Sequence, residues 1–378
     1  MTVPPSPVRS TRRFGSFVPA RRLRSVTALL VVAGLTLAGC SDSGGGGGDE
    51  LQVVQNPKRA TPVASPPTTE RPAGRVVGVD GDVTALASAD GILAVALDSN
   101  GDTEGNGGKD SGAGKGSNGT DSNGTVQLHD LREPRSAPRT VSLPGAVTSL
   151  RTIGDEVVAA MPDADAFARI DPTSGKAETV EVDGGPSGVA AIGDETLVAL
   201  RDGKAVQVLD AQDRPTRTIR GELYSADDVL AADGGAVVLD KLRTAAFSVD
   251  LDDDTVSEGL RAGQGAANAD TDEYGRVLVT DVRNGALLAF DADPLLLRQR
   301  LPVDGGPYGV AYDARRDVAW VTLTERNEVV GYSIRGGQPE EKFRLPTVRQ
   351  PDSVTVDERT SQVVIGSAAE EGIQVITP

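Results

Sequence analysis

An internal repeat of about 40 residues constrains this chain more than any other feature, because repeats of this length are typical of solenoids and propellers. Each unit contains a Gly-, Pro- or Asp-rich turn followed by four short strands, of which the first two are apolar. The unit at 307–345 shows all four strands, at 307–312, 318–322, 328–334 and 342–345. No helical periodicity interrupts the pattern, so the repeat predicts an all-β fold.

One apolar residue in the first strand of each unit gives the repeat its register. These residues are Val83, Val147, Val189, Val229, Ala269, Val310 and Val354. The last five spacings are 42, 40, 40, 41 and 44 residues, whereas the first is 64 and includes a low-complexity insert at 99–124. Four short strands at this spacing predict a β-propeller with four-stranded blades. Seven units predict seven blades, and rings of six or eight blades are the alternatives.

The two ends of the repeat region are complementary. The last unit stops after residues 372–376, one strand short, and an additional strand at 75–79 precedes the first unit. A strand from the N-terminal end that completes the last blade would remove unpaired edges, which otherwise favour aggregation. We therefore expect a ring closed by an N-terminal strand.

The N-terminal 39 residues have the pattern of an export signal. They contain six arginines and no acidic residue, and Val26–Leu37 is an apolar run too short to span a bilayer. The run ends in Leu37-Ala38-Gly39-Cys40, which resembles the lipobox of bacterial lipoproteins. This resemblance implies cleavage before Cys40 and lipidation of its sulfur. General secretion fits better than the twin-arginine route, because Gly15 follows Arg12-Arg13 where that motif requires a large apolar residue.

Residues 40–74 have the composition of a tether. Five consecutive glycines are followed by several prolines, a combination that gives flexible and extended chain. The sequence thus predicts a signal peptide at 1–39, a lipidated Cys40 with a flexible tether at 40–74, and a propeller at 75–378 with a disordered insert at 99–124.

The charge balance excludes one class of partner. The whole chain has a formal net charge of −17, and loss of the six leader arginines makes the mature chain about −23. Such a surface repels phosphate backbones, and aromatic residues are only 3% of the chain. We expect no nucleic-acid partner. Cys40 is the one cysteine, which excludes an intrachain disulfide and a cysteine-based zinc cluster.

Several stretches resemble known propeller proteins. Pro186-Ser187-Gly188-Val189-Ala190 and Pro307-Tyr308-Gly309-Val310-Ala311, followed by Ala319-Trp320-Val321-Thr322, are similar to the YVTN/NHL type of repeat. The stretches 260–266, 293–299 and 346–351 resemble actinobacterial propeller lipoproteins of the mycobacterial LppL type. This resemblance covers the leader and nearly all of 75–376. It implies the fold and an extracytoplasmic, membrane-anchored location, but no activity.

Propellers usually bind ligands at the mouth of the central channel, beside the turns that lead into the innermost strands. The two positions before each register residue supply polar side chains to this region. The candidate ligand-binding residues are Asp82, Ser187, Asp227, Asp228, Asn268, Tyr308 and Asp352. They suit a cation, an amine or a basic segment of a partner. The alternative interpretation is that these side chains cap their own turns.

The sequence offers little for catalysis. The streptogramin lyases resemble this chain in blade number and repeat type, and they depend on a catalytic histidine. Here the one histidine, His129, falls in an outer part of the first unit, away from the channel. We therefore expect a binding or scaffold module for a protein, peptide or envelope ligand, anchored to the membrane through Cys40, with no metal, cofactor or catalytic residue. The alternative is a histidine-independent hydrolase or lyase, because paired carboxylates can also perform acid–base chemistry.

Overall fold

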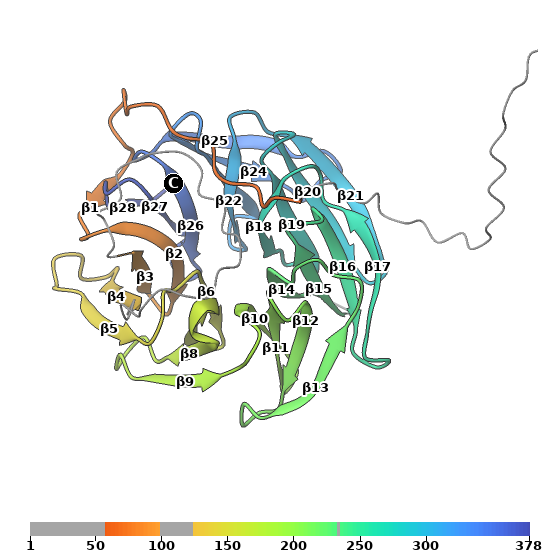
Figure 1. The fold of residues 1–378 in the computed structure, drawn as a ribbon. Coiled ribbons are helices and arrows are strands. Elements are labelled where there is room, and N and C mark those ends of the chain that lie inside the picture. The colour runs from red at the N-terminus through yellow and green to blue at the C-terminus, as the bar shows by residue number, and fades with distance from the viewer. Residues whose placement is uncertain (1–56, 99–123, 233–234) are drawn as a thin grey trace, which may run out of the picture. The chain divides into compact units, whose positions relative to one another are not determined.

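A computed structural model describes residues 57–98, 124–232 and 235–378. The expected signal peptide, Cys40, the glycine run and residues 99–123 of the insert lie outside these described residues. Within the described residues the chain is all-β, with one 3-10 turn, η1 (Pro162–Ala164), between two strands (Figure 1). No helix in this part of the chain is long and apolar enough to cross a membrane.

Five sheets contain four strands each. The first has β2 (Asp82–Ala89), β3 (Ile92–Asp98), β4 (Gly124–Asp130) and β5 (Arg139–Leu143); the second has β6 (Ser149–Ile153), β7 (Glu156–Met161), β8 (Ala166–Ile170) and β9 (Ala177–Glu181). Another has β18 (Ala266–Thr271), β19 (Arg276–Asp281), β20 (Ala286–Ala292) and β21 (Leu295–Pro302), followed by one of β22 (Pro307–Asp313), β23 (Val318–Leu323), β24 (Glu328–Ser333) and β25 (Glu340–Pro346). The last has β26 (Pro351–Asp357), β27 (Gln362–Ser367), β28 (Ile373–Ile376) and β1 (Arg75–Val77). All five are antiparallel, and the first four are meanders of consecutive strands, whereas β1 joins the last sheet from the other end of the described chain. Four antiparallel strands form the blade of a β-propeller.

The remaining sheet has eight strands. It contains β10 (Pro186–Ile192), β11 (Glu195–Leu200), β12 (Ala205–Leu209), β13 (Pro215–Arg220), β14 (Asp228–Ala232), β15 (Gly235–Asp240), β16 (Ala245–Asp250) and β17 (Thr255–Arg261). Its two halves are successive four-strand meanders, joined through their outer strands by one parallel pair, Arg220 with Thr255. The sheets therefore comprise five separate four-stranded blades and one eight-stranded sheet, rather than the seven separate blades expected from the repeat.

The first strands of successive units contact one another around a central channel. β2 contacts β6, β6 contacts β10, and the series continues through β14, β18, β22 and β26 back to β2. β1 pairs antiparallel with β28, with Arg75 opposite Val375 and Val77 opposite Ile373. The strand expected near residue 75 thus completes the last sheet.

The hydrophobic core lies between neighbouring sheets. One cluster joins Val83 and Leu93 of the first sheet to Val364 and Ile373 of the last. Another buries Trp320 against Val363, and the Trp320 ring stacks on Phe343 at 5.1 Å between centroids. A single blade cannot bury both of its faces, so each sheet depends on its neighbours for a core.

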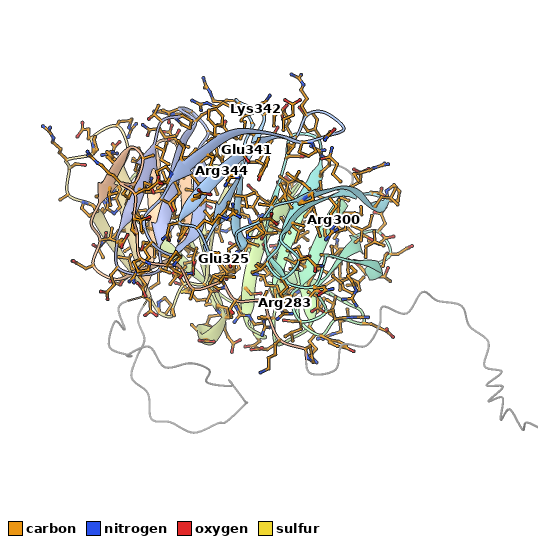
Figure 2. The ribbon with its side chains drawn as sticks, turned by 90° about the horizontal axis from the view of Figure 1, so that it is seen from above. Arg283, Arg300, Glu325, Glu341, Lys342 and Arg344 are labelled. Atoms are coloured by element: carbon orange, nitrogen blue, oxygen red, sulfur yellow. The ribbon has the colours of Figure 1, made fainter. Side chains whose placement is uncertain are left out.

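The outer strands are polar on the face that meets solvent. On β25, Arg344 forms ion pairs with Glu341 and with Glu328 of β24, and the labelled charged side chains extend from the ribbon in Figure 2. Aspartates in the hairpins accept hydrogen bonds from backbone N–H groups two or three residues onward, as Asp171 does from Thr173 and Ser174. Many acidic residues of the repeat thus stabilise turns, which is the role that Asp usually has there.

The segment before β1 differs from the expected tether. Residues 57–74 contain no strand, yet they lie against the propeller and form hydrogen bonds with it. Residues 57–74 are therefore bound to the propeller, whereas the sequence predicts a flexible tether over 40–74. The prolines keep the segment extended, and polar groups of the propeller bind its backbone.

Candidate functional site

The predicted channel mouth is a cavity of about 430 Å³ at the N-terminal ends of the first strands. Five of the seven candidate residues line it: Asp82, Asp228, Asn268, Tyr308 and Asp352. These residues come from β2, β14, β18, β22 and β26, so the fold brings together residues up to 270 positions apart in the chain. Lys241 and Arg151 also line the cavity and supply its positive charge.

β-bulges explain which position of each repeat faces the cavity. In β26, Pro351 is opposite Ser367 and Ser353 is opposite Gly366, so Asp352 is the additional residue of a bulge. Similar register shifts occur near the start of β18 and of β22. A bulge redirects the side chains beside it. Asn268 can therefore face the channel together with Tyr308 and Asp352, although it lies one residue before its register residue and they lie two before theirs.

The remaining two candidates do not line the cavity. Ser187 is buried, and its hydroxyl donates a hydrogen bond of 2.8 Å to the carbonyl of Ala226. Asp227 is also buried, and it accepts a hydrogen bond from the backbone N–H of Lys241 and one of 2.6 Å from Arg59. β14 has no bulge at its start, so Asp228 faces the channel whereas Asp227, one residue earlier, does not. Ser187 and Asp227 therefore lie outside the lining of this cavity, and a ligand-binding role for them stays a prediction.

Asp352 is a carboxylate of the mouth whose pKa is strongly altered. Burial raises the pKa of Asp352 to about 6, and the charge of Asp82 acts in the same direction. The hydrogen bond of 2.8 Å that Gln350 donates to Asp352 partly offsets this increase. Burial likewise raises the pKa of the neighbouring Tyr308 to about 12, so its hydroxyl stays protonated at neutral pH. Asp352 can therefore hold or release a proton close to neutral pH.

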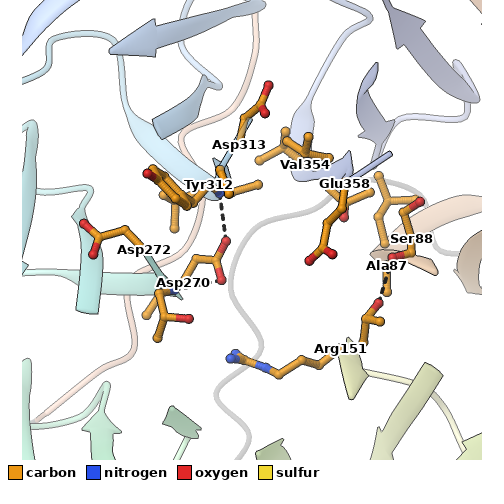
Figure 3. Close-up of a pocket in the computed structure, with 18 of the residues that line it drawn as sticks. Ala87, Ser88, Arg151, Asp270, Asp272, Tyr312, Asp313, Val354 and Glu358 are labelled. Carbon is orange, nitrogen blue, oxygen red and sulfur yellow. Dashed lines mark hydrogen bonds between the residues drawn. The ribbon is translucent and has the colours of Figure 1, made fainter. Parts of the chain in front are cut away.

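A charge cluster lies deeper in the channel. Arg151 of β6 donates a hydrogen bond of 3.0 Å to Asp228, and both side chains are mostly buried. Asp270 of β18 accepts hydrogen bonds from the N–H groups of Thr271 and Tyr312. Burial raises the pKa of Asp270, and the charge of Arg151 opposes this increase. Figure 3 shows the Arg151 side chain extending across the open channel toward Asp270.

A second cavity of about 570 Å³ occupies the other part of the channel. Leu150, Arg151, Ala269, Val310 and Val354 line both cavities, which therefore meet at the level of Arg151. Acidic side chains, including Asp270, Asp272 and Glu358, line the second cavity (Figure 3). The described residues contain no group of three or more His, Cys, Asp or Glu side chains arranged to hold a metal ion.

Sequence reasoning missed Arg151, Lys241 and Asp270. Arg151 and Asp270 lie within first strands, where the repeat usually places small or apolar residues, and this departure from the pattern is the signal that could have found them. Lys241 follows β15, and burial lowers its pKa while the charges of Asp227 and Asp228 oppose the decrease. Lys241 lies 12 residues after the register residue Val229, so the alignment of repeat positions next to the register residues does not select it.

His129 lies outside the channel. It belongs to β4, the third strand of its sheet, and its ring is 3.0 Å from the side-chain oxygen of Gln127. Burial lowers the pKa of His129, and the charge of Arg75 adds to the decrease. His129 lines neither channel cavity, as the repeat predicts.

No protein-family model matches this chain, and no curated protein matches it. Solved structures match it as β-propellers. Hydrazine synthase of Kuenenia stuttgartiensis is 15% identical with a TM-score of 0.61 over 80% of this chain and 97% of that one. The WD40 propeller of Doa1 is 12% identical with a TM-score of 0.59 over 82% and 96%.

A catalytically inactive histidine-to-alanine variant of virginiamycin B lyase from Staphylococcus aureus, solved with quinupristin, is also similar. It is 11% identical with a TM-score of 0.60, over 79% of this chain and 97% of that one. All three identities are low, so these similarities establish the β-propeller fold alone. The structural relatives include both a lyase and a WD40 domain, and such a fold supports many functions.

Proposed function

We propose that this chain is a binding module, anchored to the outer face of a membrane through lipidated Cys40, that holds a protein, peptide or envelope ligand at the channel mouth. The observation that carries the proposal is the convergence of five side chains from five separate first strands on one cavity. Convergent polar groups in a concave site are typical of ligand-binding sites. The carboxylates of Asp82, Asp228 and Asp352 favour a ligand that presents a cationic group.

The ring that supports this mouth has seven blades in our proposal. The eight-stranded sheet then counts as two blades, because its halves repeat the four-strand meander and share one residue pair. The contacts between first strands support this count, since seven such strands follow one another around the channel. The anchored location rests on the lipobox at Cys40. A Cys40→Ser variant should incorporate no labelled palmitate and should leave the detergent-rich phase on detergent partitioning.

The binding role is tested by cross-linking in cells with the anchored protein as bait. The test variant combines Asp82→Asn with Asp352→Asn, which removes two mouth charges with little change in side-chain volume. The matched control combines Glu178→Gln with Asp252→Asn, two exposed acids remote from the mouth. We expect the mouth variant to lose its main cross-linked partner and the control to keep it. Equal capture by both variants would show that the partner uses another surface.

A second candidate is a histidine-independent hydrolase or lyase. One observation favours it, because Asp352 has a pKa of about 6 beside a second carboxylate, Asp82, and can exchange a proton near neutral pH. Turnover of a cell-wall fragment or a cyclic peptide antibiotic by the purified protein, lost in Asp352→Asn, would support catalysis. Unchanged substrate after prolonged incubation with the wild-type protein would leave the binding role as the better account.

A further inference from the structure

Residues 57–67, here called the strap, lie across the face of the propeller that contains the channel mouth. Two contacts place the strap beside the cavity. Ala60 packs with Ala267 and Val282, and Tyr308, which lines the cavity, packs against this cluster. Gln350 donates one hydrogen bond to the carbonyl of Val63 and another to Asp352 of the mouth. The strap therefore borders the cavity.

The propeller holds one basic side chain of the strap in a specific subsite. Arg59 donates a hydrogen bond of 2.6 Å to the buried carboxylate of Asp227 and another of 2.6 Å to the hydroxyl of Ser225. The Asp227 side chain is only 4% exposed, whereas that of Arg59 is 40% exposed. A charge-assisted pair with one buried partner is stronger than an exposed ion pair. Asp227 thus defines a subsite for an arginine.

Two glycines leave room for the apolar side chains of the strap. A Cβ at Gly265 would lie 3.2 Å from the Cβ of Ala60, and one at Gly306 would lie 3.1 Å from a methyl group of Val63. Gly306 has a φ of +69°, a backbone conformation that favours glycine, so the turn also requires glycine there. The missing side chain at Gly265 thus leaves space for Ala60, which is buried with Ala267 and Val282.

The propeller also binds the backbone of the strap. Arg283, labelled in Figure 2, donates to the carbonyl of Lys58, and Asn327 donates to the carbonyl of Pro66. The N–H of Ser65 donates to the side chain of Gln350, and the hydroxyl of Ser65 donates to the carbonyl of Thr324. Hydrogen bonds to the main chain, combined with pockets for single side chains, are the usual means of recognising an extended peptide.

We propose that this groove is a peptide-recognition surface, occupied in the isolated chain by its own strap, and that it binds an extended segment of a partner protein with the same chemistry. The segment would match the strap residue by residue. It would carry an arginine for Asp227, as at Arg59, followed directly by a small residue, as at Ala60. An aliphatic residue would correspond to Val63, and a serine followed by proline would correspond to Ser65 and Pro66. The arginine and the small residue supply the specificity, and the remaining contacts supply the backbone register.

The strap is suited to be displaced. Of its residues only Ala60 is buried, and most of the others are exposed. Segments with few buried contacts open at low free-energy cost. However, a tethered segment competes at an effective concentration on the order of millimolar, so a free peptide binds measurably only when the strap is weakened or the partner is also held nearby.

The test uses the full chain and a fluorescent synthetic peptide of residues 57–67, with binding followed by anisotropy. Ala60→Asp should release the strap, because it places a carboxylate in the apolar hollow of Ala267 and Val282. Ala64→Asp, at an exposed strap position, is the matched control. We expect the peptide to bind the Ala60→Asp protein at least tenfold more tightly than the wild type or the control. The reason is that the intact strap of the wild type and the control competes with the peptide for the groove.

Two further measurements keep the result specific. Gln350→Ala with Asn327→Ala, added to Ala60→Asp, should abolish the binding, and a peptide with glutamate in place of arginine should not bind. Circular dichroism establishes that the variants are folded, and Arg59→Ala replaces Ala60→Asp if that variant does not fold. No binding to any folded strap variant, or dimerisation of these variants in place of peptide binding, would overturn the proposal.

Discussion

At the scale of single residues, the chemistry of the mouth depends on a few side chains held in unusual surroundings. Asp352 is the extra residue of a β-bulge, and Asp228 accepts a hydrogen bond from Arg151. Gly188 leaves room for the Asp228 side chain, because a Cβ at position 188 would lie 2.3 Å from a carboxylate oxygen of Asp228. The charges of the site are therefore positioned by backbone features as much as by neighbouring charges.

The raised pKa of Asp352 makes stability depend on pH. Its pKa of about 6 exceeds the unfolded value of 3.8, so the native state binds more protons between these two values. Stability should therefore fall as pH rises through this window and then level off above it. Asp352→Asn should remove this decline and raise the free energy of unfolding at neutral pH by on the order of 1–3 kcal/mol.

Urea denaturation at several pH values measures this effect. Asparagine keeps an oxygen that can accept the hydrogen bond from Gln350, so the substitution mainly removes the charge. Asp183→Asn, at an exposed loop position, is the matched control and should follow the wild-type pH dependence. A parallel pH profile for Asp352→Asn and the wild type would contradict the assignment of the raised pKa.

Gly188→Ala tests the geometry around Asp228. The added methyl group would overlap Asp228, including its Cα at 2.8 Å, so either the side chain or the strand must move. We expect a loss of about 1–3 kcal/mol in unfolding free energy from this overpacking. Gly78→Ala, where the Cβ would meet nothing within 4 Å, should change stability little. Equal stability of the two variants in thermal denaturation would show that β10 and β14 are less tightly packed than described.

At the scale of elements, the repeat pattern predicts the strands well and the bulges poorly. Strand positions follow from apolar alternation and from Gly and Asp turns, which are local properties of the sequence. The register shifts that turn Tyr308 and Asp352 toward the channel depend on pairing with the next strand. For this reason, selecting the two positions before each register residue found five residues that line the mouth. The same selection also took in Ser187 and Asp227, which do not line it.

β1 offers a direct test of how the last sheet is completed. Val77 is half-buried and packs with the cluster between the first and last sheets, whereas Val76, its neighbour, is 45% exposed. Val77→Asp should lower the free energy of unfolding by about 1–3 kcal/mol, because it buries a charge without a partner. Val76→Asp should have an effect within about 0.5 kcal/mol. Similar losses for both variants would contradict the orientation of β1.

At the scale of the whole molecule, the propeller combines a ring of sheets with a segment that the repeat does not include. The all-β blades and the strand that pairs with β28 could be predicted, because a missing strand at one end matched an additional strand at the other. The docked strap could not be predicted from composition. A Pro-rich segment has the same composition whether it is free or bound, and only the fit of Arg59 to Asp227 distinguishes the two.

The central claim is that a ligand binds at the channel mouth, and site-specific photo-cross-linking in cells tests it most directly. A photoreactive residue in place of Ala368, which lines the mouth, is compared with one in place of Leu296, which is exposed on the outer strand β21. Our account predicts one dominant adduct from position 368 and none from position 296. An adduct formed only from position 296, or with equal yield from both, would contradict it.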